Sequence, residues 1–416
     1  TAVAGPAAAM FVSAGAGQTV FVLSPAGTPP AVRVNDINGN PVAGVAVTFA
    51  VATGGGSATG TSAVTTVGGL ATVGSWTMGA VAGTNSLTAT AAGTGITGNP
   101  ATITASAIAT SGGGGGGGGG SPPSGGNPAL AGFRIELRFL TAGSPTQVAA
   151  FNAAATRWQN IITAKLVDAP MNIAAAQCGA NAPAVNETID DLVIFVTFAA
   201  IDGVGGTLGS AGPCYVRNAS GLPILGQMRF DTADLATMEA NGTLNSVILH
   251  EMGHVLGIGT LWDLPGLFAF LANPSLPSSP GVDTRYTGAN GTAGFNLIGG
   301  ATYTGGGKVP VENTQGGAGT RDSHWRENVL LNELMTGFVS SSGTNPLSML
   351  TLRSLQDFGY AVNTTQADAF FLTLTAAAIQ AQPGTLTPLG DDVIRVPIVV
   401  VDDRGRPTRV VRPRRP

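Results

Sequence analysis

Two histidines and one glutamate form the part of this sequence best suited to chemistry. The segment His250–His254 carries two imidazoles four residues apart, and Glu251 directly follows the first. Apolar residues recur around it at three- and four-residue spacing, which predicts a helix, and Thr243 is suited to be its N-cap. Because residues four apart share one face of a helix, the segment predicts two zinc ligands one turn apart.

A third ligand must come from another part of the chain. Gly257 is expected to end the helix, because glycine readily adopts the left-handed conformation found at helix ends. Catalytic zinc usually takes three protein ligands and leaves the fourth position to water. His324 is the one histidine left in the sequence and is our first candidate. The carboxylates of Asp263, Glu327 and Glu333 are the alternatives.

A zinc ion held in this way would support hydrolysis. Zinc lowers the pKa of a bound water to about 7, and it polarises a carbonyl group. Glu251 is rotated by roughly 100° from His250 on the helix, so its carboxylate can reach that water without binding the metal. We expect Glu251 to accept a proton during the attack and to deliver it to the leaving amine.

Four features resemble the leishmanolysin-like branch of the metzincin zinc peptidases, over about residues 130–362. They are the pattern from His250 to Gly257, a long insertion before His324-Trp325, the segment Glu333–Met335, and the segment Leu352–Tyr360. In short-spaced metzincins the third histidine stands three residues after the glycine, and here that position is Thr260. The long-insertion branch is therefore the one that fits.

The resemblance implies an α+β metzincin-type domain that holds one catalytic zinc ion. Its ligands would be His250, His254 and His324, and Glu251 would be the general base and acid. Met335 would be the methionine of the tight turn below the metal. Whether calcium stiffens the glycine-rich insertion before His324 stays open.

The resemblance also implies how a substrate would bind. In metzincins an extended peptide adds as an antiparallel strand to the edge strand above the cleft, using backbone hydrogen bonds. The corresponding residues here are Leu208, Gly209, Ser210 and Ala211. A protein or peptide is therefore the expected substrate.

A glycine run divides the chain. Nine consecutive glycines at Gly112–Gly120, followed by a segment rich in Ser and Pro, are incompatible with a packed core. We expect a multidomain protein with four parts: a β-sandwich at 1–110, a linker at 111–126, the catalytic domain at 127–365, and a C-terminal extension at 366–416 whose Arg/Pro-rich end is a solvated tail.

The N-terminal part has the pattern of an all-β sandwich. Short β-branched runs alternate with turns rich in Gly, Pro and Asn. The segment Val34–Val45 and the strand-like Val47–Phe49 after it resemble the bacterial immunoglobulin-like repeats of invasin- and intimin-type surface proteins. This part contains no histidine, so we expect a spacer, or a module that binds a surface or matrix ligand.

Two cysteines, Cys178 and Cys214, lie within the expected catalytic domain. A disulfide between them is the simpler interpretation and fits an oxidising compartment. The alternative is a free thiolate that caps the zinc in a latent form.

Composition limits the partners and the location. A net charge of −4 argues against a nucleic-acid partner. No apolar run approaches the roughly 18 residues that cross a bilayer. The first residues carry no export signal pattern, which predicts a mature or truncated product. The resemblance to bacterial surface-protein repeats predicts a bacterial protein that is secreted or held at the cell surface.

Two other functions stay open. One is a catalytically silent surface adhesin with a structural zinc, and the other is a zinc hydrolase that acts on a non-protein amide. Glu251 favours an enzyme, because a structural zinc site is normally closed by a fourth protein ligand and has no use for a neighbouring carboxylate.

Overall fold

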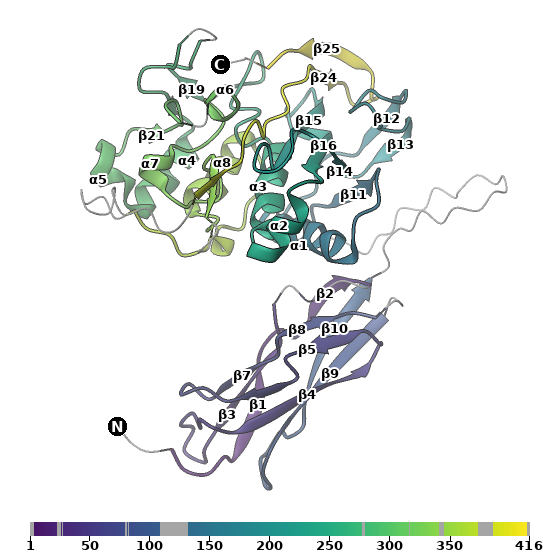
Figure 1. The fold of residues 1–416 in the computed structure, drawn as a ribbon, viewed down its shortest axis with the longest axis vertical. Coiled ribbons are helices and arrows are strands. Elements are labelled where there is room, and N and C mark those ends of the chain that lie inside the picture. Colours follow the sequence, from purple (N-terminus) through teal and green to yellow (C-terminus); the bar gives the residue numbers. More distant parts are fainter. Residues whose placement is uncertain are drawn as a thin grey trace, which may run out of the picture. The chain divides into compact units, whose positions relative to one another are not determined.

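The chain folds as two compact units, Thr1–Gly125 and Gly126–Pro416, in a computed structural model (Figure 1). The described residues are 4–22, 26, 28–79, 81, 83–108, 132–276, 279–315, 317–340, 345–372 and 386–413. The expected linker, 111–126, lies outside the described residues. Each unit is considered by itself.

The first unit is an immunoglobulin-like β-sandwich, as the sequence predicts. One sheet has three strands in the order β1-β3-β7, and the other has five in the order β2-β10-β9-β4-β6, with a separate pair β5-β8. The bounds are β1 (Ala9–Ala14), β2 (Gln18–Phe21), β3 (Ala31–Asn35), β4 (Ala46–Thr53), β5 (Ser57–Thr59), β6 (Ser62–Val64), β7 (Leu70–Thr72), β8 (Ser75–Thr77), β9 (Gly83–Ala91) and β10 (Ala101–Ile108).

Alternating side chains build the core of this sandwich. In β4, Val47 and Phe49 are buried while Thr48 between them is exposed, because successive residues of a strand point to opposite faces. Trp76 and Leu87 are fully buried in the same apolar cluster. The buried apolar side chains of both sheets therefore form the core of this unit.

A six-stranded sheet organises the second unit, in the order β11-β14-β16-β15-β24-β25. Strands β11, β14 and β16 are parallel, and β15 runs antiparallel to β16. The first five residues of the central strand β14 are all apolar and buried, as expected for a strand covered on both faces. The bounds are β11 (Ile135–Phe139), β14 (Leu192–Ala199), β16 (Pro223–Asp231), β15 (Gly209–Arg217), β24 (Ile398–Val401) and β25 (Pro407–Val411).

Two long helices cover this sheet (Figure 1). Helix α1 (Pro145–Ile161) begins with a capping box at Ser144 and Gln147 and buries Phe151 and Trp158. Helix α3 (Leu244–Leu256) packs against α1, β15 and β16. The third long helix, α8 (Met349–Phe358), packs against α4 (Ala289–Phe295). Among the described residues, no helix is both long and apolar enough to span a membrane.

Short elements complete the second unit, mostly between α3 and α8. The helical ones are α2 (Leu235–Asn241), the π-helical turn Asn296–Gly300, α5 (Ala301–Thr304), α6 (Gly317–Thr320), α7 (Glu327–Leu330) and the 3-10 turn Thr364–Gln366. The strands are β12 (Ala169–Ile173), β13 (Val185–Ile189), β17 (Asp263–Leu264), β18 (Phe268–Ala269), β19 (Leu271–Ala272), β20 (Arg285–Tyr286), β21 (Val309–Pro310), β22 (Phe338–Ser340) and β23 (Leu386–Pro388).

The C-terminal part differs from the expected separate extension with a solvated tail. Strand β24 pairs in parallel with β15, and β25 pairs antiparallel with β24, so both belong to the main sheet. Val400 and Val411 are buried, while Arg409 between them in sequence is exposed. Burial of the apolar side chains favours a strand in this segment, and the arginines of that strand point to solvent. The last residues, 414–416, lie outside the described residues.

Cys178 and Cys214 form a disulfide that joins the loop after β12 to β15. Neither cysteine is free, so the alternative of a thiolate cap on the zinc is not what the structure shows. Both residues are buried in a small apolar cluster that also includes Tyr215 of β15 and Leu225 of β16. The bond therefore ties a long loop to the strand that borders the metal centre described below.

Removing this bond should destabilise the second unit. The cysteines are separated by 36 residues in sequence, and closing a loop of that length stabilises a fold by about 4 kcal/mol. We expect Cys178→Ala/Cys214→Ala to lower the midpoint of the calorimetric transition of this unit and to leave the sandwich transition in place. An unchanged midpoint would contradict this role.

Candidate metal centre

Helix α3 presents three polar side chains from its last two turns. His250, Glu251 and His254 are all buried, and the helix ends at Gly257 with a φ of 117°. A Cβ atom at Gly257 would lie 2.9 Å from Leu261 Cδ1, so the position needs glycine for its conformation and for its space. The predicted helix and its ending residue are as the sequence indicates.

His324 lies on a loop that Glu312 holds in shape. The Glu312 carboxylate accepts hydrogen bonds from the backbone N–H groups of Thr314 at 2.8 Å and Glu327 at 3.0 Å. The backbone of Glu312 also donates to the carbonyl of His324 at 2.8 Å. Burial raises the pKa of Glu312, but these bonds to its charged form lower it overall. A charged carboxylate thus turns the end of the long insertion toward α3.

The three imidazoles converge at their Nε2 atoms. His254 Nε2 lies 2.9 Å from His250 Nε2 and 3.1 Å from His324 Nε2, and the latter two atoms are 3.2 Å apart. The Asp392 Oδ2 atom completes the group, at 2.9 Å from His324, 3.3 Å from His250 and 3.9 Å from His254. Four ligands placed about 2.0–2.1 Å from a tetrahedral zinc would be about 3.3–3.4 Å apart. The cluster has the size that a metal ion needs.

Hydrogen bonds fix the orientation of each ring. The Nδ1 atoms of His250, His254 and His324 lie 2.6, 2.8 and 3.0 Å from the backbone carbonyls of Leu334, Ile258 and Thr320. A carbonyl only accepts, so each Nδ1 carries the proton and each Nε2 is left with a lone pair.

Protonation states at the cluster also suit a cation. Burial lowers the pKa of His250 and brings that of His254 to about 4, so both rings are neutral near pH 7. Neutral rings with converging lone pairs and one carboxylate form a donor set that fits zinc.

Glu251 lies beside this cluster and is not part of it. Its two carboxyl oxygens are buried and have no hydrogen-bond partner among the described residues. Burial, with the charge of Asp392 as the second cause, raises the pKa of Glu251 well above its usual value. A Cβ atom at Gly209 would lie 3.2 Å from Glu251 Cγ, so β15 passes directly against this side chain.

Met335 packs against helix α3 at Gly253, away from Glu251. A Cβ atom at Gly253 would be 2.9 Å from the Met335 sulfur, so glycine allows the close approach. The backbone N–H of Trp325 donates to the Met335 carbonyl at 3.0 Å, which joins the His324 loop to the methionine turn.

The turn itself is held by a buried carboxylate. Glu333 accepts hydrogen bonds from the backbone N–H of Met335 at 2.7 Å and from the hydroxyls of Ser348 at 2.7 Å and Thr351 at 2.6 Å. The Thr351 hydroxyl in turn accepts from the Trp325 indole at 2.8 Å. Glu333 therefore supports the turn and is not one of the converging ligands.

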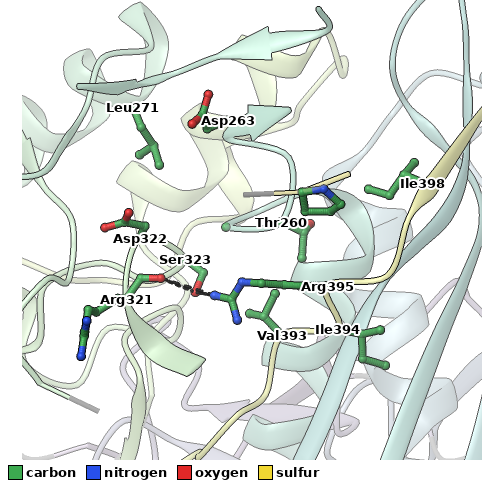
Figure 2. Close-up of a pocket in the computed structure, with 12 residues that line it drawn as sticks. Thr260, Asp263, Leu271, Arg321, Asp322, Ser323, Val393, Ile394, Arg395 and Ile398 are labelled. Carbon is green, nitrogen blue, oxygen red and sulfur yellow. Dashed lines mark hydrogen bonds between the residues drawn. The ribbon is translucent and has the colours of Figure 1, made fainter. Parts of the chain in front are cut away.

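The other alternative ligands also lie outside the cluster. Asp263 lines a neighbouring pocket with Thr260, Arg321 and Ile398, which Figure 2 shows. Glu327 is buried in α7, where burial raises its pKa to about 8. Among the candidates for the third ligand, the structure brings only His324 to His250 and His254.

Sequence reasoning missed Asp392. It follows Gly390 and Asp391 in the C-terminal part, far along the chain from the histidines and at no characteristic spacing from them. The acidic pair between apolar segments was the only signal, and acidic pairs at turns are common. Its position comes from the pairing of the C-terminal part with the main sheet.

The expected substrate edge is already paired. Leu208 and Gly209 lead into β15 beside Glu251, as the resemblance implies for an edge strand. However, the Ala211 N–H donates to the Asp392 carbonyl at 2.7 Å, and the Ile394 N–H donates to the Ala211 carbonyl at 2.8 Å. The chain's own C-terminal segment occupies the backbone groups that the resemblance assigns to a substrate.

Residues 301–380 match the sequence profile of the leishmanolysin family. This stretch includes His324, Met335 and helix α8, so the resemblance inferred from these motifs is confirmed there. The match points to a metallopeptidase, while helix α3 lies outside it. No curated protein matches the chain.

Solved structures similar to part of this chain include two of intimin domains and one of an Escherichia coli adhesin. Two structures of intimin domains show 20% and 17% identity, with TM-scores of 0.18 and 0.17, and the matches cover 24% of this chain and 46% and 44% of theirs. The Escherichia coli adhesin FdeC shows 16% identity and a TM-score of 0.19, covering 24% of this chain and 30% of that one. The chain thus spans less than half of each structure.

Replacing His324 should weaken metal binding. We expect His324→Ala to reduce zinc affinity by more than about 100-fold, because even the loss of an outer partner of a ligand costs 10–100-fold. Asp263→Ala, the matched control, should keep one zinc per chain. Both are measured by metal analysis after dialysis against a weak chelator. Stoichiometric zinc in His324→Ala would reject this ligand.

Glu327 should make stability depend on pH. Its pKa in the folded chain, about 8, exceeds the ordinary 4.5, so its stabilising contribution is complete below pH 4.5 and is lost as pH rises to about 8. Glu327→Gln should remove this loss, which is measured by urea midpoints at pH 5 and pH 8. Asp403→Asn, at an exposed position, is the control. An identical pH dependence in Glu327→Gln and the unmodified chain would contradict the assignment.

Proposed function

We propose that this protein is a secreted or surface-associated zinc-dependent endopeptidase. The observation that carries the proposal is the convergence of three Nε2 lone pairs, on His250, His254 and His324, with every Nδ1 proton engaged by a backbone carbonyl. Three facing lone pairs repel one another unless a cation lies between them. The match to the leishmanolysin family supports zinc as that cation.

The residues around the ion have separate tasks. Zinc, when bound, supplies a Lewis acid that polarises a carbonyl and acidifies a water. The three imidazoles orient the ion, and their carbonyl partners keep the rings in one tautomer. Glu251 accepts a proton at its carboxylate and returns it to the leaving amine. Burial raises the pKa of the Glu251 carboxyl, so its carboxylate is a stronger proton acceptor than an exposed one.

A protein or peptide is the substrate that the surroundings support. Strand β15 runs past Glu251, and the backbone groups of Ala211 beside it form inter-segment hydrogen bonds in the structure. An extended peptide could bond to the same backbone groups in place of the present partner. Backbone pairing accepts many sequences, so specificity would come from side-chain pockets.

One observation favours the silent adhesin with a structural zinc. Asp392 supplies a fourth protein ligand, and a site with four protein ligands is the form that structural zinc takes. The buried and unpaired carboxyl of Glu251 opposes this function, because burying such a group is costly and a structural site does not use it. We therefore prefer the peptidase.

The rest of the chain is consistent with action outside the cell. The disulfide between Cys178 and Cys214 fits an oxidising compartment. The β-sandwich would serve as a spacer or would bind a surface or matrix ligand.

Replacing Glu251 separates the metal from the chemistry. Glu251→Gln should keep one zinc per chain and reduce casein hydrolysis by at least about 100-fold, the usual contribution of a general base. The comparison is made in the unmodified chain and in an Asp392→Ala background, because Asp392 lies in the fourth ligand position. Chelator-treated enzyme is the blank. Hydrolysis by Glu251→Gln at the parent rate would reject the proposed role.

A further inference from the structure

The segment that carries Asp392 crosses the metal centre from one anchored end to the other. It starts in β23, which pairs with β22, and continues into β24 of the main sheet. We call residues 386–394 the strap. Both ends are held in regular pairing, so the strap is a built part of the fold.

The strap is bonded to one wall of the site through β15. Beyond the two bonds at Ala211, the Leu208 N–H donates to the Leu389 carbonyl at 3.4 Å. The Asp391 N–H donates to the Thr207 hydroxyl at 3.3 Å. The backbone groups next to Glu251 are therefore already paired with the strap.

The opposite wall also holds this segment. The Leu389 N–H donates to the Gly337 carbonyl at 3.1 Å. Directly after the strap, Arg395 donates to the Gly319 carbonyl and the Ser323 hydroxyl, both at 3.0 Å. Figure 2 shows the Arg395 guanidinium reaching Ser323, the residue before His324. The segment thus bridges the edge strand and the His324 loop.

With the strap in place, solvent does not reach the metal centre. His254, His324, Glu251 and Asp392 are each 0% exposed, and His250 is 1% exposed. An endopeptidase must bring a carbonyl group to the metal and to its general base. No peptide can reach either of them unless the strap moves.

The direction of the strap is the reverse of the direction expected for a substrate. Val393 bridges Ala211 in parallel, and β24 continues in parallel with β15. The expected peptide pairs with the edge strand in the antiparallel direction. The strap therefore fills the place of a substrate with its backbone reversed.

We propose that the strap is an inhibitory segment, and that its Asp392 carboxylate takes the fourth position around the metal and keeps the chain latent. This inference rests on the proposed function. Activity then requires that the strap be displaced or cut, which opens one coordination position and frees the β15 edge. The three imidazoles, which come from elsewhere, keep the ion.

The test uses the full chain loaded with zinc and acetohydroxamic acid as a metal-directed probe. Asp392→Ala removes the carboxylate, and Asp392→Asn keeps its shape in case the alanine variant does not fold. Asp391→Ala is the matched control, because the neighbouring Asp391 carboxylate is 75% exposed and forms only a loose 3.6 Å ion pair with Arg395. Probe affinity, zinc content and casein hydrolysis are measured for each protein.

We expect both Asp392 variants to bind the probe at least about tenfold more tightly than the unmodified chain, because the apparent affinity of a mostly closed chain falls in proportion to its open fraction. Zinc should stay at one per chain, and casein hydrolysis should rise in parallel. Asp391→Ala should behave as the unmodified chain does. Glu251→Gln/Asp392→Ala should keep the tight probe binding without hydrolysis.

Three results would overturn the inference. Equal probe affinity in the unmodified chain and both Asp392 variants would show that the strap does not block the metal. Loss of zinc from both folded Asp392 variants would show that the carboxylate retains the ion, as in a structural site. Tighter probe binding without casein hydrolysis would instead support the strap and reject the peptidase. Equal hydrolysis by the unmodified chain would reject the strap and support the peptidase.

Discussion

The orientation of three imidazoles by three backbone carbonyls is the constraint on which the second unit depends. Each carbonyl comes from a different part of the chain: Ile258 just after helix α3, Thr320 before the third histidine, and Leu334 in the methionine turn. A displacement of any one part would turn a ring away from the common point. The long insertion, the turn and the helix must therefore fold together for the metal centre to exist.

Buried carboxylates support this arrangement at two levels. Glu312 shapes the His324 loop through backbone N–H groups, and Glu333 shapes the methionine turn through Met335, Ser348 and Thr351. Each carboxylate has several donors, which offset the cost of burying it. Because the ligands are held before the ion arrives, metal binding here adds stability to a largely formed site.

Local features of the centre could be predicted from the sequence. The two histidines and Glu251 share one helix, and Gly257 ends it, because these relations depend on neighbours within a few residues. His324 and Met335 were inferred from a family pattern. The strand at Pro407–Val411 was missed, because an alternating strand with outward arginines resembles a solvated tail until its partner strand is known.

Asp392 shows more clearly what could not be predicted from the sequence. Nothing local distinguishes it from Asp391, yet one carboxylate is fully buried among imidazoles and the other is exposed. The difference arises from the register of the segment along β15, where Ala211 pairs with Val393 through hydrogen bonds to the backbone of Asp392 and Ile394. Long-range register of this kind leaves no trace in composition or periodicity.

The strap is covalently joined to the rest of the chain at both ends, and this affects how any outside molecule competes for the metal. A carboxylate tethered at both ends acts at a fixed effective concentration, in the millimolar range for short tethers. Dilution lowers the occupancy of a separate inhibitor and leaves a tethered one unchanged. Cleavage of the backbone within the strap would leave each half anchored at only one end, so a single cut could shift the balance permanently.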